Sequence, residues 1–134
     1  MEEKEKLDAN FDMESALEAA DSIIRDQALS IIRNNDPEID KKIAELKEKY
    51  GEVSMYIFSP EEFYIYRPLK RSEYVKIMAE KKDDEDTDLK VINTCVVYPE
   101  VEFTGDEKAG TIETLSNLIL YLSNFASNNP VVKL

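Results

Sequence analysis

Apolar residues recur at helical spacing in the first third of the chain and predict two helices there. Over residues 13–32 an apolar side chain returns every three or four positions, with charged side chains opposite. Asp36 followed by Pro37 interrupts the pattern in the order expected at a helix start. A second, narrower stripe then runs to Gly51, a residue suited to ending a helix. We therefore expect a helical hairpin over residues 13–50.

The apolar period drops to two after Gly51, which predicts strands. Residues 53–58 and 63–66 each alternate between two sets of apolar or aromatic side chains, and Ser59-Pro60-Glu61-Glu62 between them supplies the turn. The pattern predicts a two-stranded antiparallel hairpin with two apolar or aromatic faces. Because an isolated hairpin is marginal in water, it must pack on the helices or on another chain.

Three further helices are predicted after the hairpin. Arg67-Pro68 ends the second strand because proline donates no ladder hydrogen bond. Helical spacing then returns in three stretches, residues 72–82, 89–97 and 111–125. The acidic run 83–88 is expected to be a solvated loop or the start of a helix. The predicted fold class is α+β in one small domain. Its parts are a solvated tail over residues 1–12, the helical hairpin over 13–50, an α+β core over 51–127 and a C-terminal tail over 128–134.

The charge balance is strongly acidic and narrows the classes of partner. The 134 residues carry 17 basic and 29 acidic side chains and no histidine, which gives a net charge of −12. Such a charge repels phosphate backbones and anionic lipid heads, so we expect neither nucleic acid nor a membrane as partner. The longest apolar run, residues 118–122, is far too short to span a bilayer. A single cysteine and the lack of a secretory signal favour a reducing, cytoplasmic location.

The residue pattern does not point to catalysis or to a cofactor. The missing histidine removes the commonest general base and a common metal ligand. Cys95 has no cation or base beside it in the sequence, so a buried structural thiol is favoured over a nucleophile. The acidic run 83–88 lacks the glycine and the closing glutamate of a calcium-binding EF-hand loop. We therefore expect no enzyme, no metal site and no cofactor.

Two surfaces are candidates for binding another protein. One is the aromatic side of the predicted hairpin with the arginines that follow it, because tyrosine and arginine are enriched at binding hot spots. Its residues are Tyr56, Phe58, Tyr64, Tyr66, Arg67 and Arg71. The alternative is that these rings form a second layer of the core. The other candidate is a helix-pairing stripe that would build a homo-oligomer, made of Ile39, Ile43, Leu46 and Tyr50.

Four separated patches of sequence resemble one protein family. They are Tyr66-Arg67-Pro68-Leu69-Lys70-Arg71-Ser72-Glu73-Tyr74, Cys95-Val96-Val97-Tyr98-Pro99, Ala109-Gly110 and Ser123-Asn124-Phe125. In this order, over residues 49–125, they are similar to small tailed-phage proteins described as tail or baseplate-hub assembly chaperones. Lys70 departs from the pattern, because a threonine helix cap would be expected there.

The resemblance implies a non-enzymatic protein of a tailed bacteriophage that binds another tail or baseplate protein during assembly in the host cytoplasm. The alternative is a minor structural component of the tail or baseplate that stays in the virion. A third class, ranked lower, is an acidic decoy that inhibits a host DNA-binding protein by mimicking nucleic acid. Such mimics spread carboxylates over an extended surface, whereas the densest acidity here is the short run 83–88.

Overall fold

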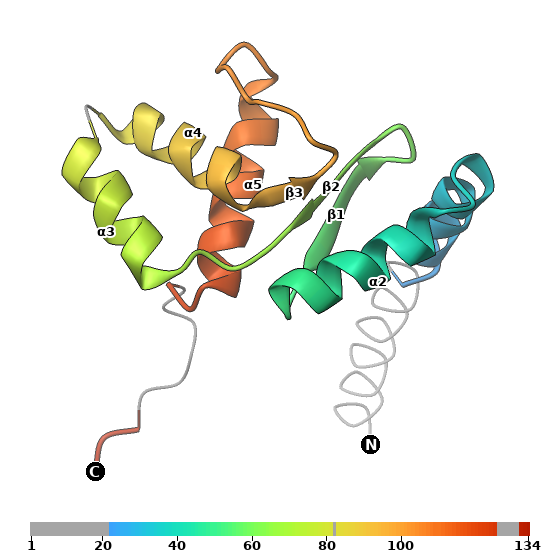
Figure 1. Ribbon diagram of the computed structural model, residues 1–134, viewed down its shortest axis with the longest axis horizontal. Helices are drawn as coiled ribbons and strands as arrows, with labels where there is room; N and C mark the ends of the chain where they lie inside the picture. Colours follow the sequence, from blue (N-terminus) through green and yellow to red (C-terminus); the bar gives the residue numbers. More distant parts are fainter. Residues whose placement is uncertain (1–21, 82, 126–131) are drawn as a thin grey trace, which may run out of the picture. The chain divides into compact units, whose positions relative to one another are not determined.

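The computed structural model describes residues 22–81, 83–125 and 132–134, and it confirms the predicted α+β class (Figure 1). The elements are a helical segment over residues 22–35, α2 (Ile39–Tyr50), β1 (Ser54–Ser59), β2 (Glu62–Tyr66), α3 (Arg71–Glu80), α4 (Asp84–Cys95), β3 (Val96–Tyr98) and α5 (Ala109–Leu122). The tail predicted over residues 1–12, the first part of the predicted helical hairpin and most of the C-terminal tail lie outside the described residues.

The chain divides into two compact units, and each is described by itself. The first unit holds the chain up to Lys42 together with Ile57–Glu62, which is the tip of the β1–β2 hairpin. The second unit holds Ile43–Tyr56 and the chain from Phe63 onward. The two surfaces predicted from the sequence draw residues from both units, since Phe58 and Ile39 fall in the first unit and their companions in the second.

In the first unit, the break between the helical segment 22–35 and α2 falls where the sequence predicts it. The Asp36 carboxylate accepts the Glu38 backbone N–H at 3.1 Å, and the Asp36 N–H donates to the Ile32 carbonyl at 2.8 Å. An ion pair of 3.1 Å joins Arg33 to Asp40 across the turn. These short-range bonds satisfy backbone groups that a broken helix would otherwise leave without partners. Ile32 is buried before the turn.

The sheet in the second unit has a strand that the sequence analysis assigned to a helix. The strand order is β1-β2-β3, and β3 pairs antiparallel with β2, with Ile65 opposite Tyr98 and Tyr66 opposite Val96. The prediction that the helix continues through Val97 is therefore wrong, since α4 ends at Cys95. A short apolar run has no periodicity that separates a helix end from a buried strand. Here the run forms a strand because it pairs with the edge of β2 that β1 does not occupy.

The core of the second unit is built around α4, which contacts α3, α5 and β3 (Figure 1). This helix begins at Asp84, so part of the acidic run forms the start of a helix, one of the two expected outcomes. The side chains that are almost fully enclosed come from strand, helices and loops alike: Ile65, Ile77, Val91, Ile92, Cys95, Phe103, Leu115 and Ile119. The predicted apolar stripes of α4 and α5 thus form a common core.

Two side-chain contacts fasten other parts of the second unit to α4. The Asn93 amide donates to the Phe103 carbonyl at 2.9 Å and accepts the Phe103 N–H at 2.7 Å, which holds the loop after β3. The Ser116 hydroxyl donates to the Asp88 carboxylate at 2.8 Å and joins α5 to α4. Both backbone groups of a buried residue, Phe103, are therefore satisfied by one side chain.

We expect Asn93→Ala to lower the free energy of unfolding by about 2 kcal/mol, because two hydrogen bonds are lost and a buried backbone pair is left unsatisfied. Urea denaturation followed by circular dichroism measures this change. Asn117→Ala, at an exposed position of α5, is the matched control and should change stability little. Equal effects of the two substitutions would show that the hydrogen bonds between Asn93 and Phe103 do not contribute to stability.

Candidate functional site

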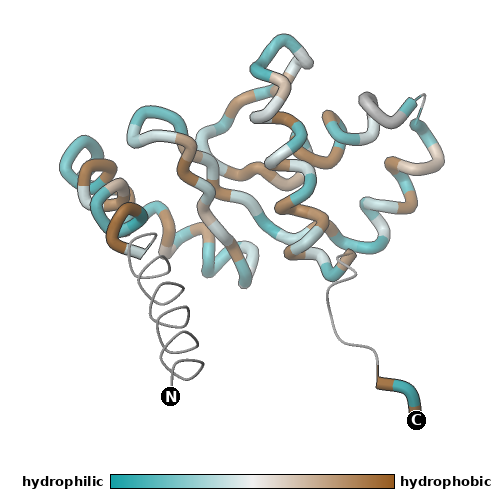
Figure 2. The backbone as a smooth tube through the Cα atoms, turned by 180° about the vertical axis from the view of Figure 1, so that it is seen from behind, coloured by the Kyte–Doolittle hydropathy of each residue, from teal (hydrophilic) through white to brown (hydrophobic). Residues whose placement is uncertain are grey.

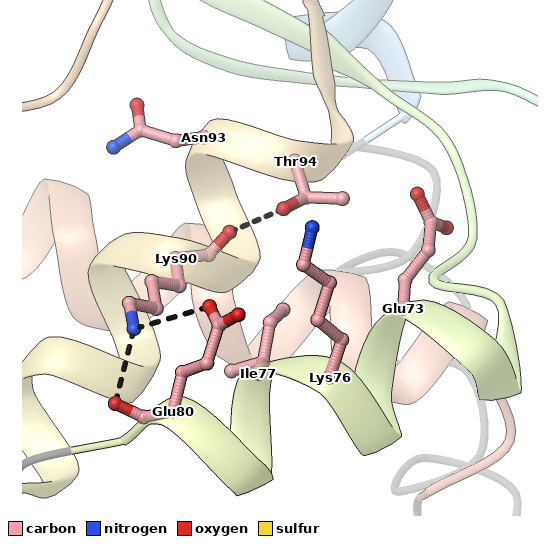
Figure 3. Close-up of a pocket in the computed structure, with 7 residues that line it drawn as sticks. All are labelled: Glu73, Lys76, Ile77, Glu80, Lys90, Asn93 and Thr94. Atoms are coloured by element: carbon pink, nitrogen blue, oxygen red, sulfur yellow. Dashed lines mark hydrogen bonds and ion pairs between the residues drawn. The ribbon is translucent and has the colours of Figure 1, made fainter.

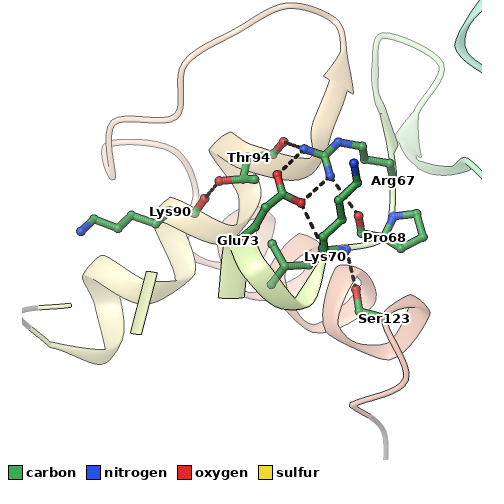
Figure 4. A network of polar contacts seen from close by, with 8 residues as sticks. Arg67, Pro68, Lys70, Glu73, Lys90, Thr94 and Ser123 are labelled. Carbon is green, nitrogen blue, oxygen red and sulfur yellow. Dashed lines mark hydrogen bonds and ion pairs between the residues drawn. The ribbon is translucent and has the colours of Figure 1, made fainter. Parts of the chain in front are cut away.

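The junction between β2 and α3 is organised by one arginine. Arg67 follows β2 directly and donates from both terminal nitrogens to the two carboxylate oxygens of Glu73, at 2.8 Å each (Figure 4). The same nitrogens donate at 3.1 Å to the carbonyls of Pro68 and Thr94. Only 13% of the Arg67 side chain is exposed. Arg67 therefore ties the end of β2 to the beginning of α3 and the end of α4.

The Arg67–Glu73 pair also caps α3. The Glu73 carboxylate accepts the Lys70 backbone N–H at 3.0 Å, which is one half of a capping box. The other half, an N–H of the first turn donated to the hydroxyl of a threonine at position 70, is not available to a lysine. Hydrogen bonding from Arg67 is the main reason that the pKa of Glu73 falls to about 2, and the same bond raises the pKa of Arg67. Bidentate pairs of this kind are among the strongest polar contacts in proteins.

A groove of about 400 Å³ lies between α3 and α4, beside this pair (Figure 3). It is lined by Glu73, Lys76, Ile77 and Glu80 from α3 and by Lys90, Asn93 and Thr94 from α4. The Lys90 ammonium donates to the Glu80 carbonyl at 3.3 Å and lies 3.9 Å from its carboxylate. Ile77 is buried. Side chains of both charge signs around a buried isoleucine are suited to holding a polar segment of polypeptide. The residues that line the groove include no nucleophile paired with a base.

The structure separates the residues of the predicted aromatic docking surface. Tyr56, Phe58 and Tyr64 are half-buried, and Tyr66 is only 6% exposed. The Tyr64 ring lies 5.4 Å from the Phe103 ring between centroids. Burial is the main cause that raises the pKa of Tyr66. Tyr66 is therefore a core residue and does not belong to an exposed surface.

The two arginines of that predicted surface also differ. Arg67 makes internal bonds to Glu73 and Thr94, whereas Arg71 is exposed at the first turn of α3. Of these two arginines, only Arg71 is exposed enough to contact a docking partner.

The predicted helix-pairing stripe is not an exposed seam. Ile39 and Leu46 are buried, Ile43 is half-buried, and only Tyr50 reaches 36% exposure. A seam between two copies of the chain needs apolar side chains that are accessible before pairing. These positions of α2 are already covered.

An exposed apolar face lies instead on the helical segment 22–35 of the first unit. Ile23, Ile24 and Ile31 are 55%, 62% and 44% exposed, and apolar positions recur along this segment (Figure 2). An open hollow of about 450 Å³ on this face is lined by Ile23, Asp26, Gln27, Ser30 and Ile31. The spacing predicts an amphipathic helix here, with its apolar residues on one side and charged residues opposite. The adjacent pairs Ile23-Ile24 and Ile31-Ile32 were the signal that the helix has two apolar faces.

Cys95 is buried, as the sequence predicts. Burial is the main cause that raises the pKa of its thiol to about 12, so it stays protonated at neutral pH. Among the residues that the structure describes, no cluster of cysteine and carboxylate side chains is arranged to hold a metal ion. Within that same part of the chain, no helix is both long and apolar enough to cross a membrane.

Comparisons with protein-family models, with curated proteins and with solved structures gave no match. The resemblance of residues 49–125 to phage tail assembly chaperones therefore stays a prediction.

Acid should remove the contribution of Glu73 to stability. Its carboxyl pKa is lowered from 4.5 to about 2 on folding, so the contribution is complete above pH 4.5 and is lost as the pH falls towards 2. We expect wild type to be more stable than Glu73→Gln by about 2 kcal/mol at pH 7 and by much less near pH 2. Urea unfolding at several pH values measures the difference. Glu113→Gln on the exposed side of α5 is the control, and a constant gap between wild type and Glu73→Gln would refute the assignment.

Tyr66→Ala should lower the free energy of unfolding by about 3 to 5 kcal/mol, because it leaves a cavity in the core. Arg71→Ala removes an exposed side chain and should leave the melting temperature nearly unchanged. Thermal unfolding followed by circular dichroism compares the two. A small effect of Tyr66→Ala would restore this ring to the set of docking candidates.

Proposed function

We propose that this chain is a non-enzymatic binding protein of a tailed bacteriophage that acts as a tail or baseplate assembly chaperone or adaptor. The observation that carries the proposal is the exposed apolar face of the helical segment 22–35, defined by Ile23, Ile24 and Ile31. We call it the isoleucine face. The sequence resemblance over residues 49–125 supplies the phage context.

The isoleucine face belongs to a helix that is anchored on its other side. Ile32 is only 1% exposed, and Ala28 and Leu29 are half-buried. Neighbouring apolar side chains that face solvent mark interaction sites, so the outward side is suited to a partner. Ile24 and Ile31 are seven positions apart, the spacing at which two helices contact each other over successive turns. The proposed occupant is an apolar helix of another tail or baseplate protein.

The charge distribution also suits a chaperone. The chain as a whole carries a net charge of −12, which keeps a complex with an apolar partner soluble. Segment 22–35 itself contains Arg25, Asp26 and Arg33, a local balance of two positive charges against one negative charge. An incoming helix therefore meets little repulsion at the isoleucine face while the remaining surface stays acidic.

The same face would serve a minor structural component of the tail or baseplate. The two roles differ in what remains after assembly, because a chaperone leaves and a structural component is retained. Mass spectrometry of purified virions separates them: absence from the particle supports the chaperone, and presence at a fixed stoichiometry supports the structural component.

Ile24→Glu combined with Ile31→Glu should abolish capture of the tail partner, because two charges would be buried against an apolar helix. Co-expression with the tail and baseplate proteins of the same phage, followed by affinity purification of this chain, measures capture. Far-ultraviolet circular dichroism should show unchanged helix content, since both side chains point outward in the free chain.

The matched control is Val101→Glu with Tyr121→Glu, which places two charges on apolar residues that are 50% and 61% exposed elsewhere. The control should keep capture. Equal capture by both variants, or a wild-type chain that binds none of the co-expressed proteins, would overturn the proposal.

A further inference from the structure

A small hollow of about 170 Å³ lies where the end of α2 approaches the turn before α3. It is lined by Lys49, Tyr50, Arg67, Pro68 and Lys70, all of them in the second unit. The Lys49 ammonium lies 5.2 Å from the centroid of the Tyr50 ring, and the Arg67 guanidinium carbon lies 5.5 Å from it. Two cations thus gather around one aromatic ring. We call this site the cationic hollow.

Every charged side chain that lines the cationic hollow is positive, although the chain carries a net charge of −12. Figure 4 shows the Lys70 side chain extending on the same side as Arg67. Like charges held this close repel one another, and the repulsion is relieved when an anion lies between them. The local sign of the potential is therefore opposite to that of the whole molecule.

The positive charge of the hollow is cancelled only at Arg67 by a residue that the structure describes. The terminal nitrogens of Arg67 are held by Glu73, Pro68 and Thr94, so Arg67 is a fixed wall whose charge is balanced by Glu73. Lys49 and Lys70 are in no ion pair with another residue of the described ranges. Two ammonium groups are thus left to act on a ligand.

The position of Lys70 gives a second, independent reason. It is the N-cap of α3, and Arg71 is the first helical residue, so two cations stand at the positive end of a helix dipole. Cations at this end are unfavourable, and a lysine offers no acceptor for the helix N–H groups. Glu73 accepts the backbone N–H of Lys70 itself and is not a substitute for that acceptor. A bound anion would offset the electrostatic cost of Lys70 at this position.

We propose that the cationic hollow binds an oxyanion, either a phosphate or a carboxylate group, held by Lys49 and Lys70 beside the Tyr50 ring. The hollow is smaller than the roughly 300–1,000 Å³ of pockets for drug-sized ligands, so the ligand is a small group or the end of a larger molecule. Its specificity comes from two ammonium groups on flexible side chains, beside a wall fixed by Arg67. This site is separate from the isoleucine face and does not depend on the proposed chaperone function.

Titration of the ¹⁵N-labelled full chain with inorganic phosphate and, separately, with glutamate tests the proposal at constant ionic strength with chloride as the background anion. We expect saturable shifts of the Tyr50 and Lys70 amide signals with at least one of the two probes. Tighter binding of phosphate assigns the site to a phosphate group, and tighter binding of glutamate assigns it to a carboxylate.

Lys49→Gln with Lys70→Gln should weaken this binding by about tenfold, since both ammonium groups are removed. The matched control is Lys47→Gln with Arg71→Gln, which removes the same charge from the same two helix ends without touching the lining of the hollow. The control should change the affinity by about twofold at most, because only longer-range attraction is lost. The spectra themselves show whether each variant is folded. No saturable shift in wild type, or equal weakening in both double variants, overturns the proposal.

Discussion

The second unit depends on the pairing of Arg67 with Glu73. An arginine at the end of a strand reaches one carboxylate on the following helix and two backbone carbonyls, one of them at the end of α4. Arg67 thereby joins the end of β2, the beginning of α3 and the end of α4 at one point. Because the pair is mostly enclosed, loss of one partner would leave a charge with little water around it. The charge pair thus limits how β2, α3 and α4 can be arranged.

The same pair explains why two nearby features exist. Glu73 accepts the N–H of Lys70, so the backbone of the N-cap residue is held without help from its own side chain. A lysine can therefore occupy the N-cap, and its ammonium is available to the cationic hollow. On the other side of α3, Glu73 lines the groove between α3 and α4. One carboxylate thus shapes both a cationic and a mixed-charge surface.

Several elements could be predicted from the sequence because local chemistry decides them. Asp36-Pro37 ends one helix and starts the next, and Arg67-Pro68 ends β2, in both cases through backbone constraints on neighbouring residues. The strand β3 could not be predicted, because Val96 and Tyr98 gain their partners from β2, some thirty positions earlier in the chain. Long-range pairing of this kind leaves no periodic trace in a three-residue strand.

The candidate sites were less predictable than the fold. Aromatic alternation in β2 could not distinguish a docking surface from a core, and the burial of Tyr66 depends on residues from other elements. The stripe on α2 was identified by its spacing, yet Ile39 and Leu46 are covered within the chain. The cationic hollow combines Lys49 with Lys70, which no motif joins. To predict a surface site, one must know what each side chain faces. The spacing of residues along one helix does not give that information.

The buried position of Cys95 has a practical consequence. This residue is the chain's single thiol, it lies at the end of α4, and its pKa of about 12 keeps it uncharged. An alkylating reagent therefore reacts only when the surrounding helices separate. The rate of modification would report the opening of the second unit directly in the unaltered protein, without any introduced label.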